Sequence, residues 1–274
     1  MNEASVRHFI GDAAVAAAPE HDRGLAYGDG LFETMRAHRG GVHWWNAHWR
    51  RLQRGARVLD IALPEEDRVH DEADTLLDGA DGVLKLILTR GAGGRGYAPP
   101  ERPTPHWILS VHPLPPASPA EGLTLRWCET RLALQPALAG IKHCNRLEQV
   151  LARAEWRDAQ THEGLMRSSE GDVVSATAAN VFVLHEGRWT TPMIDRCGVA
   201  GICREWAIGA LDAREARVAV TDVEAADAVF LCNAARGILP VARLGVRSWR
   251  PHPQVAQLQR RLAAEHPAFA TEVA

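Results

Sequence analysis

The sequence predicts an α+β fold of two domains, and three observations lead to this prediction. Short alternating apolar segments typical of strands occur in both halves of the 274 residues. A few helical patterns lie between them without a regular alternation of strand and helix. Four prolines fall within residues 112–122, where neither a central strand nor a helix could continue. We therefore expect an N-terminal domain over residues 1–112, a linker over 113–121 and a C-terminal domain over 122–274.

The elements expected in the first half follow from local patterns. Residues 30–45 read as two strands around an Arg-Gly-Gly turn. A helix follows, with Asn46 as its N-cap and apolar residues at helical spacing: Trp45, Trp49, Leu52, Ala56 and Leu59. Two further strands are expected over 82–90 and 106–112, separated by the glycine-rich residues 91–97.

The second half repeats this mixture of strands and helices. A strand is expected over 123–131, and the apolar residues Leu147, Val150, Leu151 and Ala154 then predict a helix. Short strands around 180–192 precede a helix that begins after the glycines near position 200. A strand over 227–233 and a helix from about Pro253 complete the chain.

Composition narrows the class of protein. Hydrophobic residues make up 46% and charged residues 24%, and the net charge is −3, which gives no indication of a nucleic-acid partner. The five cysteines show neither a CxxC pair nor metal-ligand spacing, as expected for reduced thiols. The run "AAVAAA" at 13–18 is too short for a signal segment or a membrane span. We expect a soluble cytoplasmic protein without a metal or a membrane partner.

Lysine is conspicuously rare in this chain. Of 31 Lys and Arg residues, only Lys85 and Lys142 are lysines. Arginine is permanently protonated, whereas a desolvated lysine can lose its proton and attack a carbonyl group. Lys142 is therefore either a nucleophile or a solvated surface charge, and Lys85, in an alternating strand, faces either a site or the solvent.

Several segments could bind anions. Gly198 and Gly201 directly precede the helix expected near position 200, and free N–H groups at a helix N-terminus bind phosphate. The glycine-rich residues 91–96 are a poor dinucleotide motif, because Tyr97 and the prolines after it prevent a helix there. That loop is either simply mobile or uses Arg90 and Arg95 to approach an anionic substrate. Arg51 is either a phosphate contact or one of several arginines on a helix face.

Seven segments together indicate a family. In chain order they are "DRGLAYGDGLFET", "HWRRL", "TRGAGGRGY", "GIKHCNRLEQVLAR", "ATAANVF", "GVAGICR" and "LCNAARGILPV". This set resembles the fold-type IV enzymes that depend on pyridoxal phosphate (PLP), which include branched-chain and D-amino-acid aminotransferases and aminodeoxychorismate lyases. The resemblance extends over about residues 9–245, and its glycine-rich loop and lysine segment are most similar to those of the lyases.

The resemblance implies a structure and an activity. The fold would have two domains with PLP between them, and the protein would be a homodimer. The activity would be a lyase reaction of folate biosynthesis that converts 4-amino-4-deoxychorismate to 4-aminobenzoate and pyruvate. An aminotransferase of the same fold is the first alternative, and a PLP-binding protein without turnover is the second.

Residue roles follow from the same resemblance. Lys142 would be the Schiff-base lysine and the base that moves the ring proton, and Arg51 would hold the cofactor phosphate. Tyr27 and Thr34 would line the pocket, and Arg90 and Arg95 would bind substrate carboxylates. The remaining phosphate ligands would come from the backbone of these residues: Gly201, Ile202, Cys203, Asn233 and Ala234.

One position departs from the family pattern. The family usually has a glutamate five residues before the asparagine of its N-x-F motif, where the carboxylate pairs with the pyridine nitrogen. That asparagine is Asn180 here, and the corresponding position is Ser175. A hydroxyl stabilises a protonated ring nitrogen poorly, so this difference favours an elimination driven by aromatisation over transamination.

Overall fold

The computed structural model describes residues 6–270, and these residues form two compact units. Unit 1 comprises the chain up to Leu114 together with Ile141–Asn145, and unit 2 comprises Pro115–Gly140 and the chain from Arg146 onward. The short segment Ile141–Asn145, which contains Lys142, therefore belongs by its contacts to unit 1. From the sequence we had placed it with the C-terminal part of the chain.

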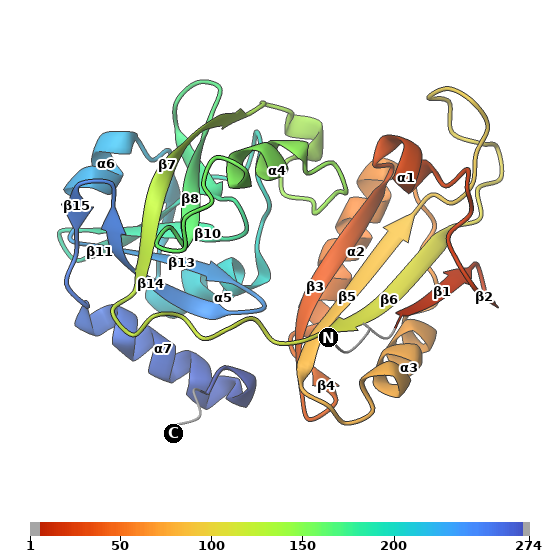
Figure 1. Ribbon diagram of the computed structural model, residues 1–274, viewed down its shortest axis with the longest axis horizontal. Helices are drawn as coiled ribbons and strands as arrows, with labels where there is room; N and C mark the ends of the chain where they lie inside the picture. Colours follow the sequence, from red (N-terminus) through yellow and green to blue (C-terminus); the bar gives the residue numbers. More distant parts are fainter. Residues whose placement is uncertain (1–5, 271–274) are drawn as a thin grey trace. The chain divides into compact units, whose positions relative to one another are not determined.

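Unit 1 is built on a six-stranded antiparallel sheet in the order β2-β1-β6-β5-β3-β4 (Figure 1). The strands are β1 (Val6–Ile10), β2 (Ala13–Val15), β3 (Gly30–His38), β4 (Gly41–Val42), β5 (Gly82–Thr89) and β6 (His106–His112). Its helices are α1 (Arg23–Tyr27), α2 (Trp45–Leu59) and α3 (Glu66–Leu77). The strands β3 to β6 and the helix α2 confirm the expected elements of this half, whereas β1, β2 and α1 were not expected.

Two details of the unit 1 helices differ from the expectation. The helix α2 begins at Trp45 and no side chain caps it, so Asn46 is not its N-cap. The helix α3 was not expected, because nearly half of its residues are acidic and its apolar face is narrow. That face consists of Val69, Ala73 and Leu77, spaced four residues apart and buried.

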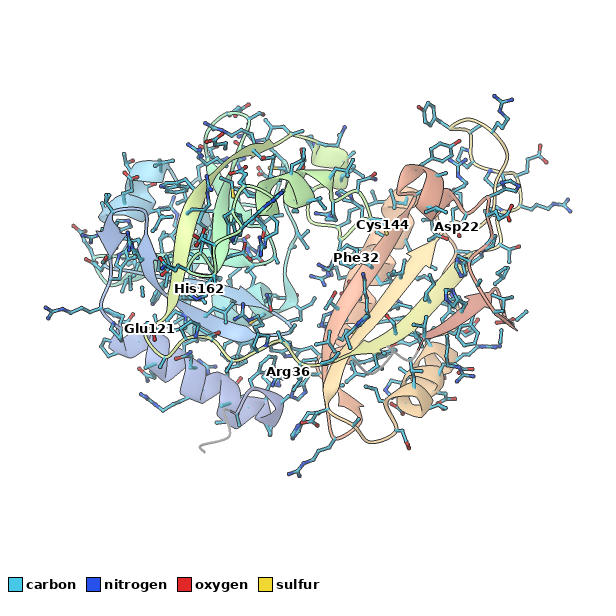
Figure 2. All side chains as sticks on the ribbon, in the orientation of Figure 1. Asp22, Phe32, Arg36, Glu121, Cys144 and His162 are labelled. Atoms are coloured by element: carbon cyan, nitrogen blue, oxygen red, sulfur yellow. The ribbon has the colours of Figure 1, made fainter. Side chains whose placement is uncertain are left out.

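The two faces of the unit 1 sheet differ in character. Because side chains alternate along a strand, β3 directs Leu31, Met35 and Ala37 to a buried face that packs against α2. The opposite face is partly exposed and carries Phe32, Thr34 and Arg36 from β3. Figure 2 labels Phe32 and Arg36 on this strand.

Unit 2 contains a mixed sheet in the order β12-β11-β10-β13-β14-β7-β8-β9, with β15 paired to β14. Its strands are β7 (Leu123–Leu132), β8 (Glu163–Ser168), β9 (Val173–Ala176), β10 (Asn180–His185), β11 (Arg188–Pro192), β12 (Arg214–Ala216), β13 (Ala228–Asn233), β14 (Gly237–Leu244) and β15 (Arg247–Ser248). Its helices are α4 (Leu147–Arg153), α5 (Ile202–Leu211), α6 (Val220–Ala225) and α7 (Pro253–Glu265). A core of Leu, Val and Ala side chains, among them Val181, Val229 and Leu231, holds the sheet together.

Candidate functional site

Lys142 lies at the edge of the unit 1 sheet, directly beside β3. The Phe32 N–H donates a hydrogen bond to the Lys142 carbonyl (2.9 Å), and the Cys144 N–H donates to the Gly30 carbonyl (2.8 Å). These bonds pair Ile141–Asn145 with the first residues of β3 as a short antiparallel strand, with Leu31 opposite His143. In such a pairing Lys142 stands opposite Phe32 and shares its face of the sheet. Its Nζ lies 4.2 Å from the centroid of the Phe32 ring.

Glycine and asparagine hold this segment at its far end. The Asn145 Nδ2 donates to the Gly28 carbonyl (3.3 Å), and Gly28, at the C-terminus of α1, has a φ of 66°. A Cβ on Gly28 would come within 2.4 Å of the Asn145 side chain, so only glycine allows this close approach. The backbone around Lys142 is thus fixed on both sides.

Arg51 belongs to a buried charged cluster between α2 and β3. Its Nε donates to Glu33 Oε1 (2.8 Å), its Nη2 donates to Glu33 Oε2, and His48 Nδ1 donates to the same Oε2 (2.6 Å). All three side chains are less than 5% exposed. Burial raises the pKa of Glu33, but the charge and hydrogen bonds of Arg51 and His48 outweigh it and lower the pKa to about 2. Glu33 is therefore an anion that fixes the orientation of Arg51.

Glu33 was absent from the residues expected at the site, although the sequence contains a signal for it. Glu33 alternates along β3 with the same spacing as Leu31, Met35 and Ala37, so it faces the buried side of the sheet with them. A buried carboxylate on an apolar face requires a partner. Arg51, on the helix that covers this face, is that partner.

In unit 2, the glycines expected to precede a helix lie at the N-terminus of α5. Gly201 is the N-cap residue, and no side chain caps the helix. The Asn180 Nδ2 donates to the Val199 carbonyl (2.9 Å), which holds the turn before the helix in place. A Cβ on Gly201 would meet Asn180 Oδ1 at 2.1 Å. The first-turn N–H groups of Ile202 and Cys203 therefore follow a tightly fixed turn, an arrangement that suits a phosphate.

A second turn of unit 2 follows β13. The Asn233 Oδ1 accepts hydrogen bonds from the N–H groups of Ala235 (3.1 Å) and Arg236 (2.8 Å), and its Nδ2 donates to the Ala178 carbonyl (3.1 Å). The hydrogen-bonding groups of the Asn233 side chain are thus used within its own turn, which leaves the backbone of this turn to contact a ligand.

Ser175 is 9% exposed and lies in β9, paired with Met166 of β8.

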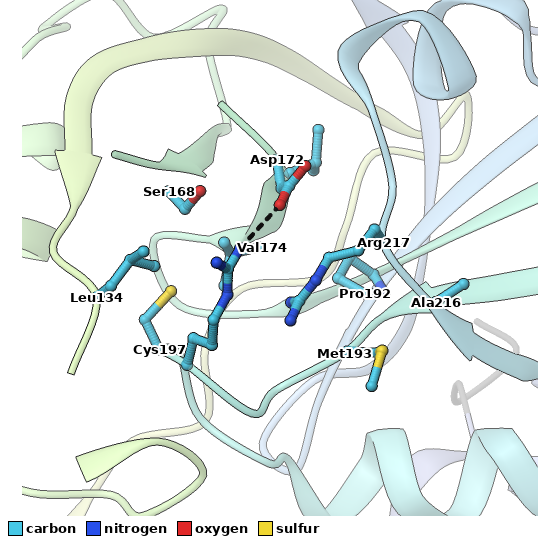
Figure 3. Close-up of a pocket in the computed structure, with 11 residues that line it drawn as sticks. Leu134, Ser168, Asp172, Val174, Pro192, Met193, Cys197, Ala216 and Arg217 are labelled. Atoms are coloured by element: carbon cyan, nitrogen blue, oxygen red, sulfur yellow. Dashed lines mark hydrogen bonds and ion pairs between the residues drawn. The ribbon is translucent and has the colours of Figure 1, made fainter. Parts of the chain in front are cut away.

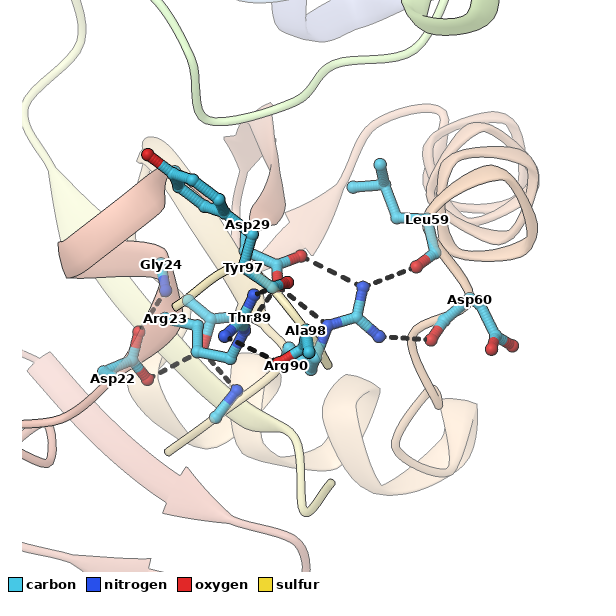
Figure 4. Close-up of polar contacts among 12 residues, drawn as sticks. Asp22, Arg23, Gly24, Asp29, Leu59, Asp60, Thr89, Arg90, Tyr97 and Ala98 are labelled. Carbon is cyan, nitrogen blue, oxygen red and sulfur yellow. Dashed lines mark hydrogen bonds and ion pairs between the residues drawn. The ribbon is translucent and has the colours of Figure 1, made fainter. Parts of the chain in front are cut away.

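The structure gives Arg90 a structural role instead of the expected contact with a substrate. Its Nε and Nη2 donate to the Asp29 carboxylate (2.8 and 3.1 Å), and its Nη1 and Nη2 donate to the carbonyls of Asp60 and Leu59 (both 2.6 Å), as Figure 4 shows. Because its guanidinium is buried and satisfied on both edges, we withdraw it from the proposed substrate ligands.

A buried arginine that the sequence had not indicated anchors the glycine-rich loop. Arg23 donates from Nε to Asp29 Oδ2 (2.8 Å) and from its terminal nitrogens to the carbonyls of Gly96, Tyr97 and Ala98 (2.9–3.3 Å; Figure 4). Arg95, in contrast, is exposed. Tyr27 is 36% exposed and packs edge-on against Tyr97, with ring centroids 5.5 Å apart.

A separate hollow in unit 2 contains none of the candidate residues (Figure 3). Two of its lining residues, Arg196 and Arg217, form ion pairs with Asp172 (3.2 Å) and Asp195 (2.6 Å). Its charges are thus already neutralised. Among residues 6–270 the structure shows no group of acidic, His or Cys side chains suited to a metal ion, and no helix in this range is long and apolar enough to cross a membrane.

Comparison with known proteins gives a consistent result. The family described as "Amino-transferase class IV" matches residues 30–244. Aminodeoxychorismate lyase of Vibrio harveyi is 35% identical over 254 residues, which cover 89% of this chain and 93% of that protein. The crystal structure of 4-amino-4-deoxychorismate lyase from Pseudomonas aeruginosa is 41% identical, with a TM-score of 0.87 over 94% of this chain and 99% of that chain.

Aminotransferases are also among the similar proteins. A putative branched-chain-amino-acid aminotransferase of Methanocaldococcus jannaschii is 29% identical over 88% of this chain and 87% of its own length. The Escherichia coli branched-chain aminotransferase structure has a TM-score of 0.84 at 19% identity over 97% of this chain and 96% of that chain, a likeness of fold.

Proposed function

This chain belongs to the class IV aminotransferase family, and we propose that it is a PLP-dependent lyase that converts 4-amino-4-deoxychorismate to 4-aminobenzoate and pyruvate. The proposal is supported by the lyases of Vibrio harveyi and Pseudomonas aeruginosa, both of which this chain matches over almost their whole length. The single observation that carries it is the position of Lys142, whose backbone is hydrogen-bonded to β3 and whose amine lies beside the Phe32 ring.

The residues of each unit fit this cofactor. In unit 1, Lys142 offers an amine for covalent attachment, and Arg51 offers a guanidinium whose direction Glu33 sets. In unit 2, the uncapped N-terminus of α5 after Gly201 offers N–H groups for a phosphate. We assign Ile202 and Cys203, together with the backbone of Asn233 and Ala234, to the same phosphate.

When bound, PLP supplies an electron sink for the carbon that carries the substrate amine. We assign to the freed Lys142 amine the removal of the proton from that carbon. The bond between the neighbouring ring carbon and the ether oxygen then breaks, and its loss completes the aromatic ring. The leaving enolpyruvate gains a proton and becomes pyruvate, so substrate and products balance.

Ser175 distinguishes the lyase from an aminotransferase of the same family. We place its hydroxyl at the pyridine nitrogen, where the family usually has a carboxylate. A neutral hydroxyl stabilises a protonated nitrogen less than a carboxylate does. Elimination is assisted by aromatisation and tolerates this weaker environment better than transamination does.

A coupled assay tests the proposed function. Purified protein with PLP is given 4-amino-4-deoxychorismate, and pyruvate release and 4-aminobenzoate formation are measured beside a panel of amino donors and keto acids. Stoichiometric formation of both products supports the lyase. Keto-acid release from amino donors without pyruvate from 4-amino-4-deoxychorismate would identify an aminotransferase, and bound PLP without either product would identify a binding protein.

The proposal extends to folate biosynthesis in the cytoplasm and to a homodimer. Sedimentation of the purified protein tests the dimer, and growth of a deletion strain with and without 4-aminobenzoate tests the pathway.

A further inference from the structure

Lys85 is a partly buried ammonium group without an anionic partner. Within residues 6–270 the structure gives its side chain a contact with the Phe32 ring, 5.5 Å from Nζ to the centroid, and neither a hydrogen bond nor an ion pair. Most of the buried or partly buried arginines that support unit 1, such as Arg23, Arg51 and Arg90, are paired with carboxylates. The Lys85 Nζ is not among the buried side-chain atoms that lack a hydrogen-bond partner, so solvent reaches the ammonium. An accessible ammonium with no carboxylate of its own can form a charge-assisted hydrogen bond to an anionic ligand.

Both lysines of the chain contact the same aromatic ring. Lys142 stands opposite Phe32 across the edge of β3, and Lys85 stands opposite Thr34 in the pairing of β3 with β5. Side chains directly opposite each other, and those two residues along a strand, lie on one face of a sheet. Lys85 is therefore one step along the same face from Lys142, and both ammonium groups lie near the ring of Phe32.

The row of residues that contains Lys85 is rich in donors. Thr34 is paired with Lys85 on one side in β3 and Ser110 on the other side in β6, so two residues with hydroxyl groups flank Lys85 in the sheet. Ser110 shares a hydrogen bond with His112 (2.9 Å). A carboxylate placed over this row would meet an ammonium and a hydroxyl donor at once.

Acidic side chains do not compete for Lys85 on this face. Strands β3, β5 and β6 direct no Asp or Glu to it, and Glu33 points to the opposite face. Asp81, just before β5, is bound at the far end of the face by His38 (3.1 Å) and the Arg39 N–H (2.6 Å). Asp22 reaches the sheet beyond Thr89, where it accepts hydrogen bonds from Thr89 (2.7 Å) and His106 (3.0 Å). The positive charge of this row is therefore available to a ligand.

We propose that Lys85 binds a carboxylate of the substrate beside the reacting centre at Lys142, with Thr34 as a second donor. This inference rests on the proposed function, whose substrate carries a ring carboxylate and an enolpyruvyl carboxylate. Lysine suits the role because its compact ammonium is a point charge with three donors that fits between Thr34 and Phe32. The assignment replaces Arg90 as a candidate carboxylate ligand.

The test compares Lys85→Met, Lys85→Arg and Thr34→Val with the wild type, and Arg54→Met serves as the matched control. Arg54 is an exposed arginine of α2, so its loss changes the net charge equally without touching this face. Loss of one charge-assisted contact in Lys85→Met should raise KM for 4-amino-4-deoxychorismate about tenfold to a hundredfold, with a smaller effect on kcat. Lys85→Arg should recover part of the loss, Thr34→Val should lose a few-fold, and Arg54→Met should match the wild type.

Direct titration distinguishes the two carboxylates and does not require turnover. If Lys85 binds the ring carboxylate, Lys85→Met weakens 4-aminobenzoate binding by the same factor as it raises KM, while binding of aniline, which lacks a carboxylate, is unchanged. If it binds the enolpyruvyl carboxylate, only the KM for the substrate rises.

Two results would overturn the inference. One is a Lys85→Met variant that matches Arg54→Met in both KM and 4-aminobenzoate binding. The other is a Lys85→Met variant that is folded but no longer binds PLP, since Lys85 would then serve the cofactor. A wild-type protein that binds PLP and 4-aminobenzoate but releases no pyruvate would instead count against the proposed function.

Discussion

At the scale of single residues, the proposed chemistry depends on the amine of Lys142. Only an amine can form the covalent bond to the PLP aldehyde, and the chain has just two lysines. Lys142→Ala should abolish covalent attachment of PLP and reduce pyruvate release by several orders of magnitude. Borohydride reduction followed by mass spectrometry should find PLP on the Lys142 peptide of the wild type. Label on the Lys85 peptide would show that the wrong lysine has been assigned.

Glu33 orients Arg51, and its ionisation also contributes to the free energy of unfolding of unit 1. Its pKa is lowered to about 2 in the folded protein, from an ordinary value of 4.5. A carboxylate with a lowered pKa stabilises the fold above its unfolded pKa, and this stabilisation is lost as the pH falls through the folded value. The free energy of unfolding should therefore decrease between about pH 4.5 and about pH 2.

Urea unfolding of the wild type and Glu33→Gln across this range measures the effect. The variant should be less stable at neutral pH, because it leaves Arg51 without a buried anion, and its stability should depend less on acid. If the free energy of unfolding fell equally with pH in the two proteins, the assignment would be contradicted.

The same cluster makes Arg51→Ala a poor probe of phosphate binding by itself. The variant would also leave Glu33 buried and unpaired, at a cost of about 3–5 kcal/mol.

Ser175 determines how strongly the bound cofactor withdraws electrons, if its hydroxyl faces the ring nitrogen. Ser175→Glu would place an anion there and favour the protonated ring. We expect transamination of ordinary amino acids to rise relative to pyruvate release, through unequal stabilisation of the two transition states. Both activities should be measured in the wild type and the variant. An unchanged ratio together with an unchanged cofactor spectrum would mean that Ser175 is not at the ring.

At the scale of elements, two glycines of α5 and its N-cap provide a matched pair. Gly201 precedes the helix with no room for a Cβ, which would lie 2.1 Å from Asn180 Oδ1, whereas a Cβ on Gly209 would meet nothing within 4 Å. Gly201→Ala must displace Asn180 or the turn, so it should weaken PLP binding at least tenfold. Gly209→Ala should leave binding unchanged and stabilise the helix by up to about 1 kcal/mol.

Fluorescence titration of the apoproteins with PLP, together with thermal unfolding of both variants, checks this pair. Repeating the titration with pyridoxal, which lacks the phosphate, isolates the phosphate contribution, because the effect of Gly201→Ala should largely disappear. Equal losses for PLP and pyridoxal would indicate that Gly201 acts elsewhere on the cofactor.

The helix α4 shows that the sequence can predict a helix without predicting whether its apolar side chains are buried. Its apolar spacing correctly predicted a helix, but Leu147, Val150 and Leu151 are 76%, 59% and 60% exposed in the chain. The periodicity of these residues depends on local geometry, whereas the surface that they face depends on the rest of the fold.

At the scale of the whole molecule, PLP should stabilise the folded chain. A ligand that binds only the folded state stabilises it by about 2.7 kcal/mol at a hundredfold excess over its Kd. Calorimetry should therefore show a rise in Tm with PLP, and Gly201→Ala in unit 2 should diminish this rise. Lys142→Ala in unit 1 should diminish it as well. A Tm that does not respond to PLP in the wild type would argue against a cofactor role for either residue.

The sequence by itself determined most of the elements and the family, and it predicted roles for Lys142 and for the glycines before α5. These features depend on local patterns: side-chain alternation, helical spacing, glycine and proline positions, and the rarity of lysine. Only the tertiary structure decided which unit contains Lys142. Backbone hydrogen bonds join its segment to the first residues of β3, which lie more than 100 residues earlier in the chain.

The tertiary structure also decided which charges are available to a ligand. Arg90 and Lys85 are close in sequence. The sequence predicted Arg90 as a ligand of an anionic substrate and left open whether Lys85 faces a site or the solvent. In the fold, Arg90 meets Asp29 and two backbone carbonyls, whereas Lys85 meets an aromatic ring. The counter-ions and hydrogen-bond acceptors of Arg90 come from elements that are distant in the sequence, so only the fold could show that this charge is already used.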